Sequence, residues 1–244
     1  MIRSVANVIP QRLLPDASPV EAGRSSLTAD LILPSLNEEE GLAWLLPRLP
    51  EGTRAVVVDN GSTDATAQVA CDFGATVVRA EQRGFGAACW AGLHHSTSDV
   101  VAFMDADATL DPQQLHRVLR PVLEGQADLV LGARVPQPGS WPMHARLANR
   151  VLAREITKRT GQAFRDLGPM RAARRTALLS LDLQDRRSGW PLEMLLKAVS
   201  AGWRCVEVPV DYLPRKGTSK VTGTARGSLQ AVRDMRQELQ RHSA

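Results

Sequence analysis

One short stretch constrains the fold of this chain more than any other. Val100-Val101-Ala102-Phe103-Met104 is an apolar run with the length of a fully buried strand, and it leads directly into Asp105-Ala106-Asp107. Strands of this kind belong to parallel sheets that helices cover on both faces. The two carboxylates therefore fall at the carboxyl end of the strand, where open α/β sheets bind their ligands.

The spacing of these two acids predicts a cation between them. Asp105 and Asp107 would repel each other at that edge unless a positive ion lies close, and hard oxygen ligands suit Mg2+ or Mn2+. Such ions keep several waters and take further ligands from substrate phosphates, so one interpretation is a metal-diphosphate site. The alternative is an acidic turn that caps the next helix, because Asp111-Pro112 has the features of a helix start.

A strand-then-helix order repeats through residues 30–135. We expect strands at 30–33, 55–59, 75–78, 100–104 and 128–132, and helices at 38–46, between 64 and 73, from Gly84 onward and at 112–123. Asn37 is expected to cap the first helix. The alternation predicts an α/β fold with a doubly wound, mostly parallel central sheet and helices on both faces.

The pattern changes beyond Arg134. Residues 143–160 form a predicted helix with Met143, Leu147 and Val151 on one side. The same helix carries a basic stripe at a spacing of four residues, made of Arg146, Arg150, Arg154 and Lys158. This stripe is either a solvated face or a surface that faces phosphates. Further on we expect a helix from about 190 that ends before residue 202, a strand at 204–210 and a basic loop at 215–220.

Composition limits the class of protein. Lys and Arg total 30 against 26 Asp and Glu, and this mild excess does not indicate a nucleic-acid-binding protein, although it suits an anionic substrate or a membrane surface. Cys71, Cys89 and Cys205 lie far apart without zinc or redox spacing, which favours a reducing cytoplasm. No apolar run approaches the roughly 18 residues of a membrane span, and no signal-peptide core is present.

Both ends of the sequence differ from the middle. Residues 1–28 are rich in Pro, Ser and Arg, which predicts a mobile extension or a strap. Residues 228–244 are amphipathic and predict a helix with Leu229, Val232, Met235 and Leu239 on one stripe. That helix either packs on the domain or lies on a membrane surface.

Three sequence motifs in order resemble the inverting family 2 glycosyltransferases with the GT-A fold. They are Pro34-Ser35-Leu36-Asn37-Glu38, the segment 57–64 that contains Asp59, and Met104-Asp105-Ala106-Asp107. The second half is similar to the polyprenyl-phosphate branch, the dolichyl-phosphate mannose or glucose synthases. That similarity lies in Gly132-Ala133-Arg134, residues 166–171 and residues 215–220. It covers about residues 29–227, with 29–135 as the nucleotide-binding half and 136–227 as the acceptor half.

The resemblance implies a role for each matching residue. Asp105 and Asp107 would hold the metal on the diphosphate of a UDP- or GDP-sugar. The nucleobase and ribose of the donor would be bordered by Pro34, Asn37, Glu38 and Asp59, and further donor contacts would come from Gly84 and Ala106. The residues that would grip donor and acceptor phosphates are Arg134, Arg215, Ser219 and Lys220. The chain departs from this branch at Asn60, where a second Asp is common, and at Thr109, where Gln is frequent.

The implied reaction is a single displacement at the anomeric carbon, with inversion. A hydroxyl acceptor would need a general base, for which Glu193 and Asp166 are the candidates, although Glu193 could instead pair with Lys197 four residues on. A phosphate acceptor is already ionised and would need none. We therefore expect a metal-dependent transferase to a polyprenyl phosphate, cytoplasmic and in peripheral contact with the inner membrane face. The alternatives are a soluble acceptor, a nucleotidyltransferase or an inactive sugar-nucleotide binder.

Overall fold

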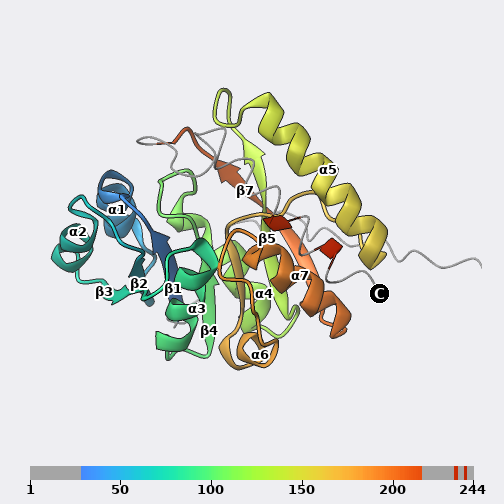
Figure 1. The fold of residues 1–244 in the computed structure, drawn as a ribbon, viewed down its shortest axis with the longest axis horizontal. Coiled ribbons are helices and arrows are strands. Elements are labelled where there is room, and N and C mark those ends of the chain that lie inside the picture. Colours follow the sequence, from blue (N-terminus) through green and yellow to red (C-terminus); the bar gives the residue numbers. More distant parts are fainter. Residues whose placement is uncertain (1–28, 216–233, 236–238, 241–244) are drawn as a thin grey trace, which may run out of the picture.

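The computed structural model describes residues 29–215, 234–235 and 239–240. A seven-stranded mixed sheet forms its centre, in the order β3-β2-β1-β4-β6-β5-β7, with helices on both faces (Figure 1). The strands are β1 (Ala29–Ser35), β2 (Thr53–Asp59), β3 (Thr76–Arg79), β4 (Val100–Phe103), β5 (Leu129–Pro136), β6 (Arg171–Arg174) and β7 (Cys205–Tyr212). The helices are α1 (Glu39–Leu45), η1 (Leu46–Arg48), α2 (Thr66–Asp72), α3 (Phe85–His95), η2 (Pro112–Gln114), α4 (Leu115–Leu123), α5 (Met143–Thr160), α6 (Arg175–Ser180) and α7 (Trp190–Ser200).

Side chains of the central strands are buried on both faces, as parallel strands covered by helices require. Leu31 and Leu33 of β1 pack into a cluster with α1 and α4, whereas Ile32 packs into a second cluster with α3 and α7. The alternation follows from the two-residue period of a strand. The mostly parallel α/β sheet that the sequence predicts is confirmed.

One strand of the sheet was not predicted. β6 lies between β4 and β5 and runs antiparallel to both, so these two predicted strands are not neighbours. Its sequence, Arg171-Ala172-Ala173-Arg174, lacks the β-branched and aromatic residues that favour strands. The strand forms because its small side chains fit the crowded centre of the sheet, where Ala172 and Ala173 are fully buried. Tertiary packing here overrides local propensity.

The start of the first helix also differs from the prediction. α1 begins at Glu39 with Glu38 as its N-cap, and Asn37 has a positive φ of 54°. The Asn37 Oδ1 atom accepts a hydrogen bond from Thr63 N over 2.7 Å. The predicted capping by Asn37 is therefore wrong, because this side chain binds the loop after β2 instead.

Other predicted starts and ends are confirmed. α5 covers the predicted residues 143–160. Asp111 caps the next turn, since its carboxylate accepts from Gln113 N over 3.0 Å. Near the C-terminus, Met235 and Leu239 pack against the cluster that contains α3 and α7, which agrees with packing of the predicted tail helix at these two residues. Residues 1–28, Ser219, Lys220 and most of 228–244 lie outside the described residues.

Candidate active site

The carboxyl ends of β1, β2, β4, β5 and β7 meet at one edge of the sheet (Figure 1). β1 and β2 are parallel and paired up to Ser35 and Asp59. β4 ends beside β1, where Met104 N donates to Ile32 O over 3.2 Å. β5 and β7 are parallel up to Tyr212. The loops that carry most of the predicted donor-binding residues therefore lie side by side at this edge.

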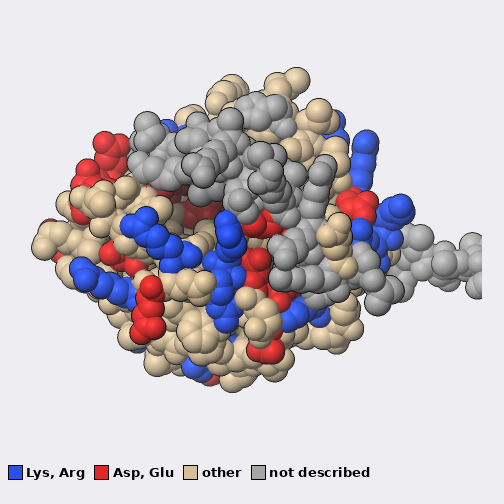
Figure 2. Space-filling model, in the orientation of Figure 1, with Lys and Arg blue, Asp and Glu red and all other residues tan. Residues whose placement is uncertain are grey.

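Asp105 and Asp107 follow β4 directly, and Asp107 is held in one orientation. Its Oδ1 accepts hydrogen bonds from Thr109 N (3.0 Å) and Thr109 Oγ1 (2.6 Å), and its Oδ2 pairs with Arg215 Nη2. Thr109 therefore orients the second acid of the pair. Figure 2 shows acidic side chains at the bottom of a hollow in this face of the molecule, beside a row of Lys and Arg side chains.

The surroundings of Asp105 disfavour the ionised form of its carboxyl group. Burial raises the pKa of its carboxyl to about 6, and the negative charge of Asp107 adds to this, while Arg134 and Arg215 act in the opposite direction. Among the described residues, none donates a hydrogen bond to this carboxylate. An acid that is crowded by a second acid and lacks donors gains most from a cation, so the pair fits a divalent metal ion.

The peptide between the two acids is fixed from behind by α1. A Cβ atom at Gly41 would lie only 2.0 Å from Ala106 O, so this helix can approach the loop only with a glycine there. Ala106 is itself buried, and Ala108 turns the chain with a positive φ of 60°. The spacing of Asp105 and Asp107 is thus set by the packing of the loop.

The chain after β7 brings Arg215 to the acidic pair. Leu213 N donates to Thr109 O over 2.8 Å, and Tyr212 forms an antiparallel bridge with Leu110. Arg215 Nη1 is buried and has no hydrogen-bond partner among the described residues. A buried donor without an acceptor is costly, so an anionic ligand beside Asp107 would satisfy it.

The loops after β1 and β2 bind each other through polar side chains. Asn37 N donates to Ser62 Oγ (2.9 Å), and Glu38 N donates to Thr66 Oγ1 (2.8 Å). Asp59 is buried at the end of β2, and its Oδ1 accepts from Ser62 N over 2.9 Å. The predicted donor-binding residues of β1 and β2 therefore form one connected surface.

The Asn60 side chain forms two hydrogen bonds with the backbone. Its Nδ2 donates to Gln82 O (2.9 Å) and its Oδ1 accepts from Gly84 N (2.8 Å), which fastens the loop before α3 to the end of β2. An Asp here could accept the second bond but could not donate the first when ionised. The amide is thus a structural requirement of this loop.

The backbone at Gly84 and Gly86 lies close to the backbone of Asp185 and Arg186. A Cβ atom at Gly84 would lie 2.1 Å from Arg186 O, and one at Gly86 would lie 2.5 Å from Asp185 O. The first N–H groups of α3 donate to the backbone of the same segment, since Gly86 N binds Arg187 O over 2.9 Å. These glycines allow the start of α3 to contact residues 185–187, and donor binding by Gly84 stays a prediction.

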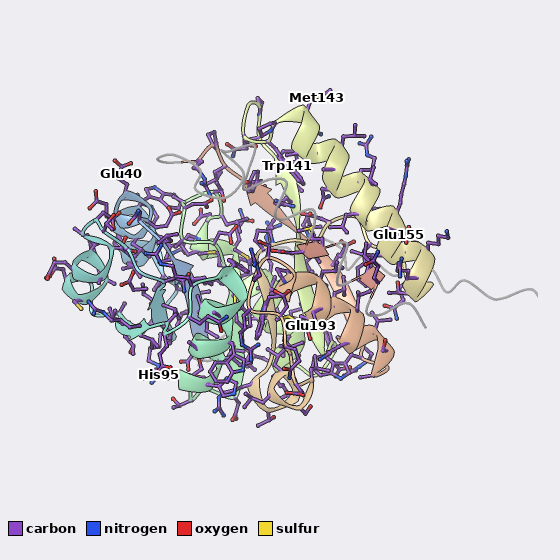
Figure 3. All side chains as sticks on the ribbon, viewed as in Figure 1. Glu40, His95, Trp141, Met143, Glu155 and Glu193 are labelled. Carbon is purple, nitrogen blue, oxygen red and sulfur yellow. The ribbon has the colours of Figure 1, made fainter. Side chains whose placement is uncertain are left out.

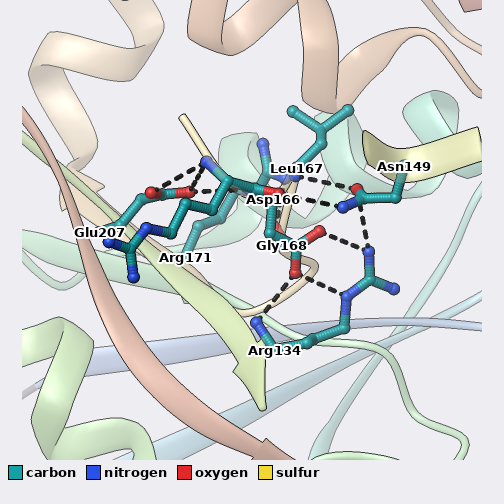
Figure 4. Close-up of polar contacts among 8 residues, drawn as sticks. Arg134, Asn149, Asp166, Leu167, Gly168, Arg171 and Glu207 are labelled. Atoms are coloured by element: carbon teal, nitrogen blue, oxygen red, sulfur yellow. Dashed lines mark hydrogen bonds and ion pairs between the residues drawn. The ribbon is translucent and has the colours of Figure 1, made fainter. Parts of the chain in front are cut away.

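Arg134, at the end of β5, is held from several sides (Figure 4). Its Nε (2.7 Å) and Nη2 (2.6 Å) donate to the two carboxylate oxygens of Asp166, whose Oδ2 also accepts from Arg134 N. The guanidinium carbon lies 3.9 Å from the ring centroid of Trp141 and 5.3 Å from that of Tyr212. Asp166 is in turn held by Glu207, which accepts from Asp166 N over 2.9 Å. The Arg134 side chain is thus oriented before any ligand binds.

Comparison with known proteins gives the family of this chain. Residues 30–180 match the family described as Glycosyl transferase family 2. The chain belongs to this family. An uncharacterized glycosyltransferase of Mycobacterium tuberculosis is 47% identical over 206 residues, which cover 84% of this chain and 94% of that protein. An undecaprenyl-phosphate mannosyltransferase of Micrococcus luteus is 31% identical over 212 residues, which cover 79% and 86% of the two chains. The protein is therefore a glycosyltransferase enzyme, as the sequence predicts.

Solved structures confirm the fold of this glycosyltransferase. Glucosyl-3-phosphoglycerate synthase from Mycobacterium tuberculosis, crystallised with Mn2+, UDP-glucose and phosphoglyceric acid, superposes with a TM-score of 0.69 at 22% identity. The match covers 94% of this chain and 89% of that one. The same synthase in complex with Mg2+ and UDP gives a TM-score of 0.65. At this identity the likeness establishes a shared fold.

The structure of the glycosyltransferase adds residues that the sequence reasoning missed. Trp141, Tyr212, Glu207 and Asn149 all contact Arg134 or Asp166, and Asn149 Nδ2 also donates to Arg165 O over 3.2 Å. Tyr212 lies between the predicted strand 204–210 and the predicted basic loop 215–220, and this position was the only signal for it in the sequence. The other three residues come from separate elements, and only the fold brings them together.

Arg171 is a further buried cation of this glycosyltransferase. Its Nη1 donates to Pro191 O (2.9 Å) and its Nη2 to Gly168 O. Burial lowers the pKa of the guanidinium to about 10, while the negative charge of Asp105 acts in the opposite direction. Arg171 lies in the motif formed by residues 166–171, but the resemblance implies no role for it. Its positive charge favours the ionised form of Asp105.

Glu193 is engaged within α7 and the preceding loop. It is buried, pairs with Lys197 Nζ over 2.9 Å, and accepts from Gln184 N (2.8 Å) and Asp185 N (2.7 Å). Burial raises the pKa of this carboxyl, but the hydrogen bonds from Gln184, Lys197 and Asp185 outweigh it and leave the pKa below its ordinary value. The predicted pairing with Lys197 is confirmed, and a role as general base stays a prediction.

Proposed function

We propose that this glycosyltransferase transfers a sugar from a UDP- or GDP-sugar to a polyprenyl phosphate, with inversion at the anomeric carbon. The observation that carries the proposal is the meeting of Asp105 and Asp107 with Arg134 and Arg215 at one edge of the sheet. Paired acids suit a metal-bound diphosphate, and the arginines suit the charge of two phosphate-bearing substrates.

Asp105 and Asp107 would hold Mg2+ or Mn2+ on the donor. Within the residues that the structure describes, no group of three or more His, Cys, Asp or Glu side chains is placed to bind a metal. Two carboxylates suffice when the diphosphate and water complete the shell. When bound, the ion supplies Lewis-acid stabilisation of the charge on the departing nucleoside diphosphate. Crystals of glucosyl-3-phosphoglycerate synthase contain Mn2+ or Mg2+ with UDP, which supports this choice of ions.

Arg215 and Arg134 would bind different phosphate groups. Arg215 already lies on Asp107 and has a buried Nη1 that lacks a described acceptor, which a diphosphate oxygen would provide. Arg134 is oriented by Asp166, so little side-chain entropy is lost when it binds an anion. The predicted donor residues on the loops after β1 and β2 would bind the nucleoside. Ser219 and Lys220 stay in the proposal as further phosphate ligands.

The acceptor half favours an ionised acceptor. Asp166 is committed to Arg134, and both oxygens of Glu193 accept hydrogen bonds from Gln184 N. A phosphate acceptor needs no general base, so these engaged acids do not obstruct the reaction. The names of two relatives point the same way. One is the Micrococcus luteus enzyme, and the other is a dolichyl-phosphate hexose transferase of Haloferax volcanii, 29% identical over 203 residues. We further propose that residues 29–135 bind the donor and residues 136–227 the acceptor.

Release of nucleoside diphosphate tests the proposal. The purified chain is incubated with a panel of UDP- and GDP-sugars and Mg2+ or Mn2+, with a polyprenyl phosphate, with phosphoglyceric acid or without acceptor. We expect release that depends on the polyprenyl phosphate and a product of inverted anomeric configuration by NMR. Release with phosphoglyceric acid alone would identify a soluble acceptor. Binding of a donor without any release would identify an inactive sugar-nucleotide binder.

A further inference from the structure

One face of α5 exposes large apolar side chains to solvent. Met143, Leu147 and Val151 follow each other at a spacing of four residues, and their exposed fractions are 81%, 60% and 58%. This spacing places them on one stripe along a helix of 18 residues, about 27 Å long. A contiguous exposed apolar stripe marks an interaction site more often than isolated exposed side chains do.

Basic side chains lie on the same face as the apolar stripe. With a rotation of 100° per residue, each of them falls within about 60° of one of the three apolar residues. They are exposed, and none forms a salt bridge with another described residue. The outer face of α5 is defined by all seven residues: Met143, Arg146, Leu147, Arg150, Val151, Arg154 and Lys158.

The opposite side of α5 is fastened to the domain. Ala153 and Ile156 are buried, and Asn149 contacts Arg134 and Leu167 N beside the candidate active site. Figure 3 shows Met143 at the outer end of α5, with Trp141 closer to the sheet. The helix therefore presents a fixed outer face whose inner side belongs to the Arg134 network.

We propose that the outer face of α5 docks on the surface of a lipid bilayer that carries anionic headgroups. The three apolar side chains would enter the boundary between headgroups and acyl chains, as those of interfacial helices do. The long basic side chains would reach headgroup phosphates while their aliphatic parts lie along the apolar stripe. Charge complementarity and the interleaving of basic with apolar residues both select this partner.

Two other partners fit the face less well. A second copy of the chain paired through the same face would bring the four basic residues of each helix close to those of the other, and like charges oppose such pairing. A nucleic acid would satisfy the basic residues but would leave Met143, Leu147 and Val151 without apolar contact. Of these three partners, the membrane surface is the one that uses both kinds of side chain.

The membrane contact does not depend on the identity of the acceptor. A docked α5 would hold Arg134 near the lipid surface through Asn149, which would favour an acceptor that resides there. The contact would nevertheless occur if the acceptor were soluble. It can therefore be measured without any enzyme assay.

Vesicle flotation of the full chain tests the proposal. The vesicles contain phosphatidylcholine alone or phosphatidylcholine with phosphatidylglycerol. One variant carries Met143→Ser, Leu147→Ser and Val151→Ser, and a second carries Gln at the four basic positions of the face. The matched control combines Phe73→Ser and Arg79→Gln, which change an exposed apolar and an exposed basic residue away from α5. Light scattering of each protein reports its mass in solution.

We expect flotation with the anionic vesicles only. Binding should fall by at least about tenfold in the apolar variant. It should fall by about fivefold for each basic residue removed at low salt, and the control should bind like the original chain. Equal flotation of the apolar variant and the original chain would overturn the proposal, as would equal binding to both kinds of vesicle. Unchanged flotation with a loss of dimer mass in the variants would assign the face to contacts between copies.

Discussion

Different interactions hold the loops of the proposed donor half (residues 29–135) and connect that half to the proposed acceptor half (residues 136–227). In the proposed donor half, hydrogen bonds without ion pairs join the loops at the site, such as those from Asn37 N to Ser62 Oγ and from Asn60 Nδ2 to Gln82 O. Arg134, at the end of the proposed donor half, forms an ion pair with Asp166 of the proposed acceptor half, and a third charged group, Glu207, supports this pair. We therefore expect the loops of the donor half to tolerate the loss of one bond, whereas loss of the Asp166 charge would leave the largely buried charge of Arg134 without its partner.

The acidic pair belongs to the proposed donor half, close to Arg134 and Arg215, and should give the largest effect on activity. Replacing both Asp105 and Asp107 by Asn removes the charge that would hold the cation, and we expect kcat/KM to fall by about a thousandfold or more. The fold should persist, since an Asn at position 107 can still accept from Thr109 N. Nucleoside diphosphate release measures the first effect, and circular dichroism measures the second.

Folded double-Asn protein with unchanged kcat/KM would remove the acidic pair from the mechanism. Each single Asn variant should show a smaller loss than the double variant if the two carboxylates hold one ion together.

Asp166 should have the largest effect on stability. Asp166→Asn leaves the largely buried Arg134 guanidinium without its counter-charge, and breaking a pair of this kind costs about 3 kcal/mol. The free energy of unfolding from urea titration measures the loss. The control is Asp128→Asn, which breaks the exposed pair with Arg204 and should change the unfolding midpoint little.

Equal losses in these two variants would mean that burial of the Arg134–Asp166 pair adds nothing to its strength. The stated difference between the loop contacts of the donor half and its ion pair with the acceptor half would then not hold.

The sequence predicts the acidic residues of the proposed donor half better than it predicts the Arg134–Asp166 pair. Asp59, Asp105 and Asp107 come directly after apolar strands, and the carboxyl ends of parallel strands meet at one edge, so their proximity followed from order along the chain. Arg134 and Asp166 were both predicted, but their pairing depends on β6, which local propensity does not indicate. A short strand of Arg and Ala is specified by its neighbours in the sheet, and these are set by the whole fold.

A change of charge at Asn60, in the proposed donor half, should have a moderate effect on the free energy of unfolding. Asn60→Asp restores the residue common in the resembling synthases but removes the donor to Gln82 O and places a carboxylate beside that oxygen. We expect a loss of about 2 kcal/mol in the free energy of unfolding. Asn60→Ala, which keeps neither bond but introduces no charge, is the control and should lose less. A more stable Asp variant would show that the amide is not what fastens this loop.

Glu193 should give the smallest effect, and one that depends on pH. Because its pKa lies below the ordinary value of 4.5 in the folded chain, its contribution to stability is present above that value and is lost as the pH falls through the folded pKa. Glu193→Gln should therefore cost about 1 kcal/mol at neutral pH, since the bond with Lys197 and one acceptor are lost. Thermal unfolding from pH 7 to pH 3 measures this, and the two melting curves should converge at the acid end. A constant difference across that range would mean that burial and packing, rather than ionisation, stabilise this position, and Glu193 would then resemble the loop contacts without ion pairs in the donor half.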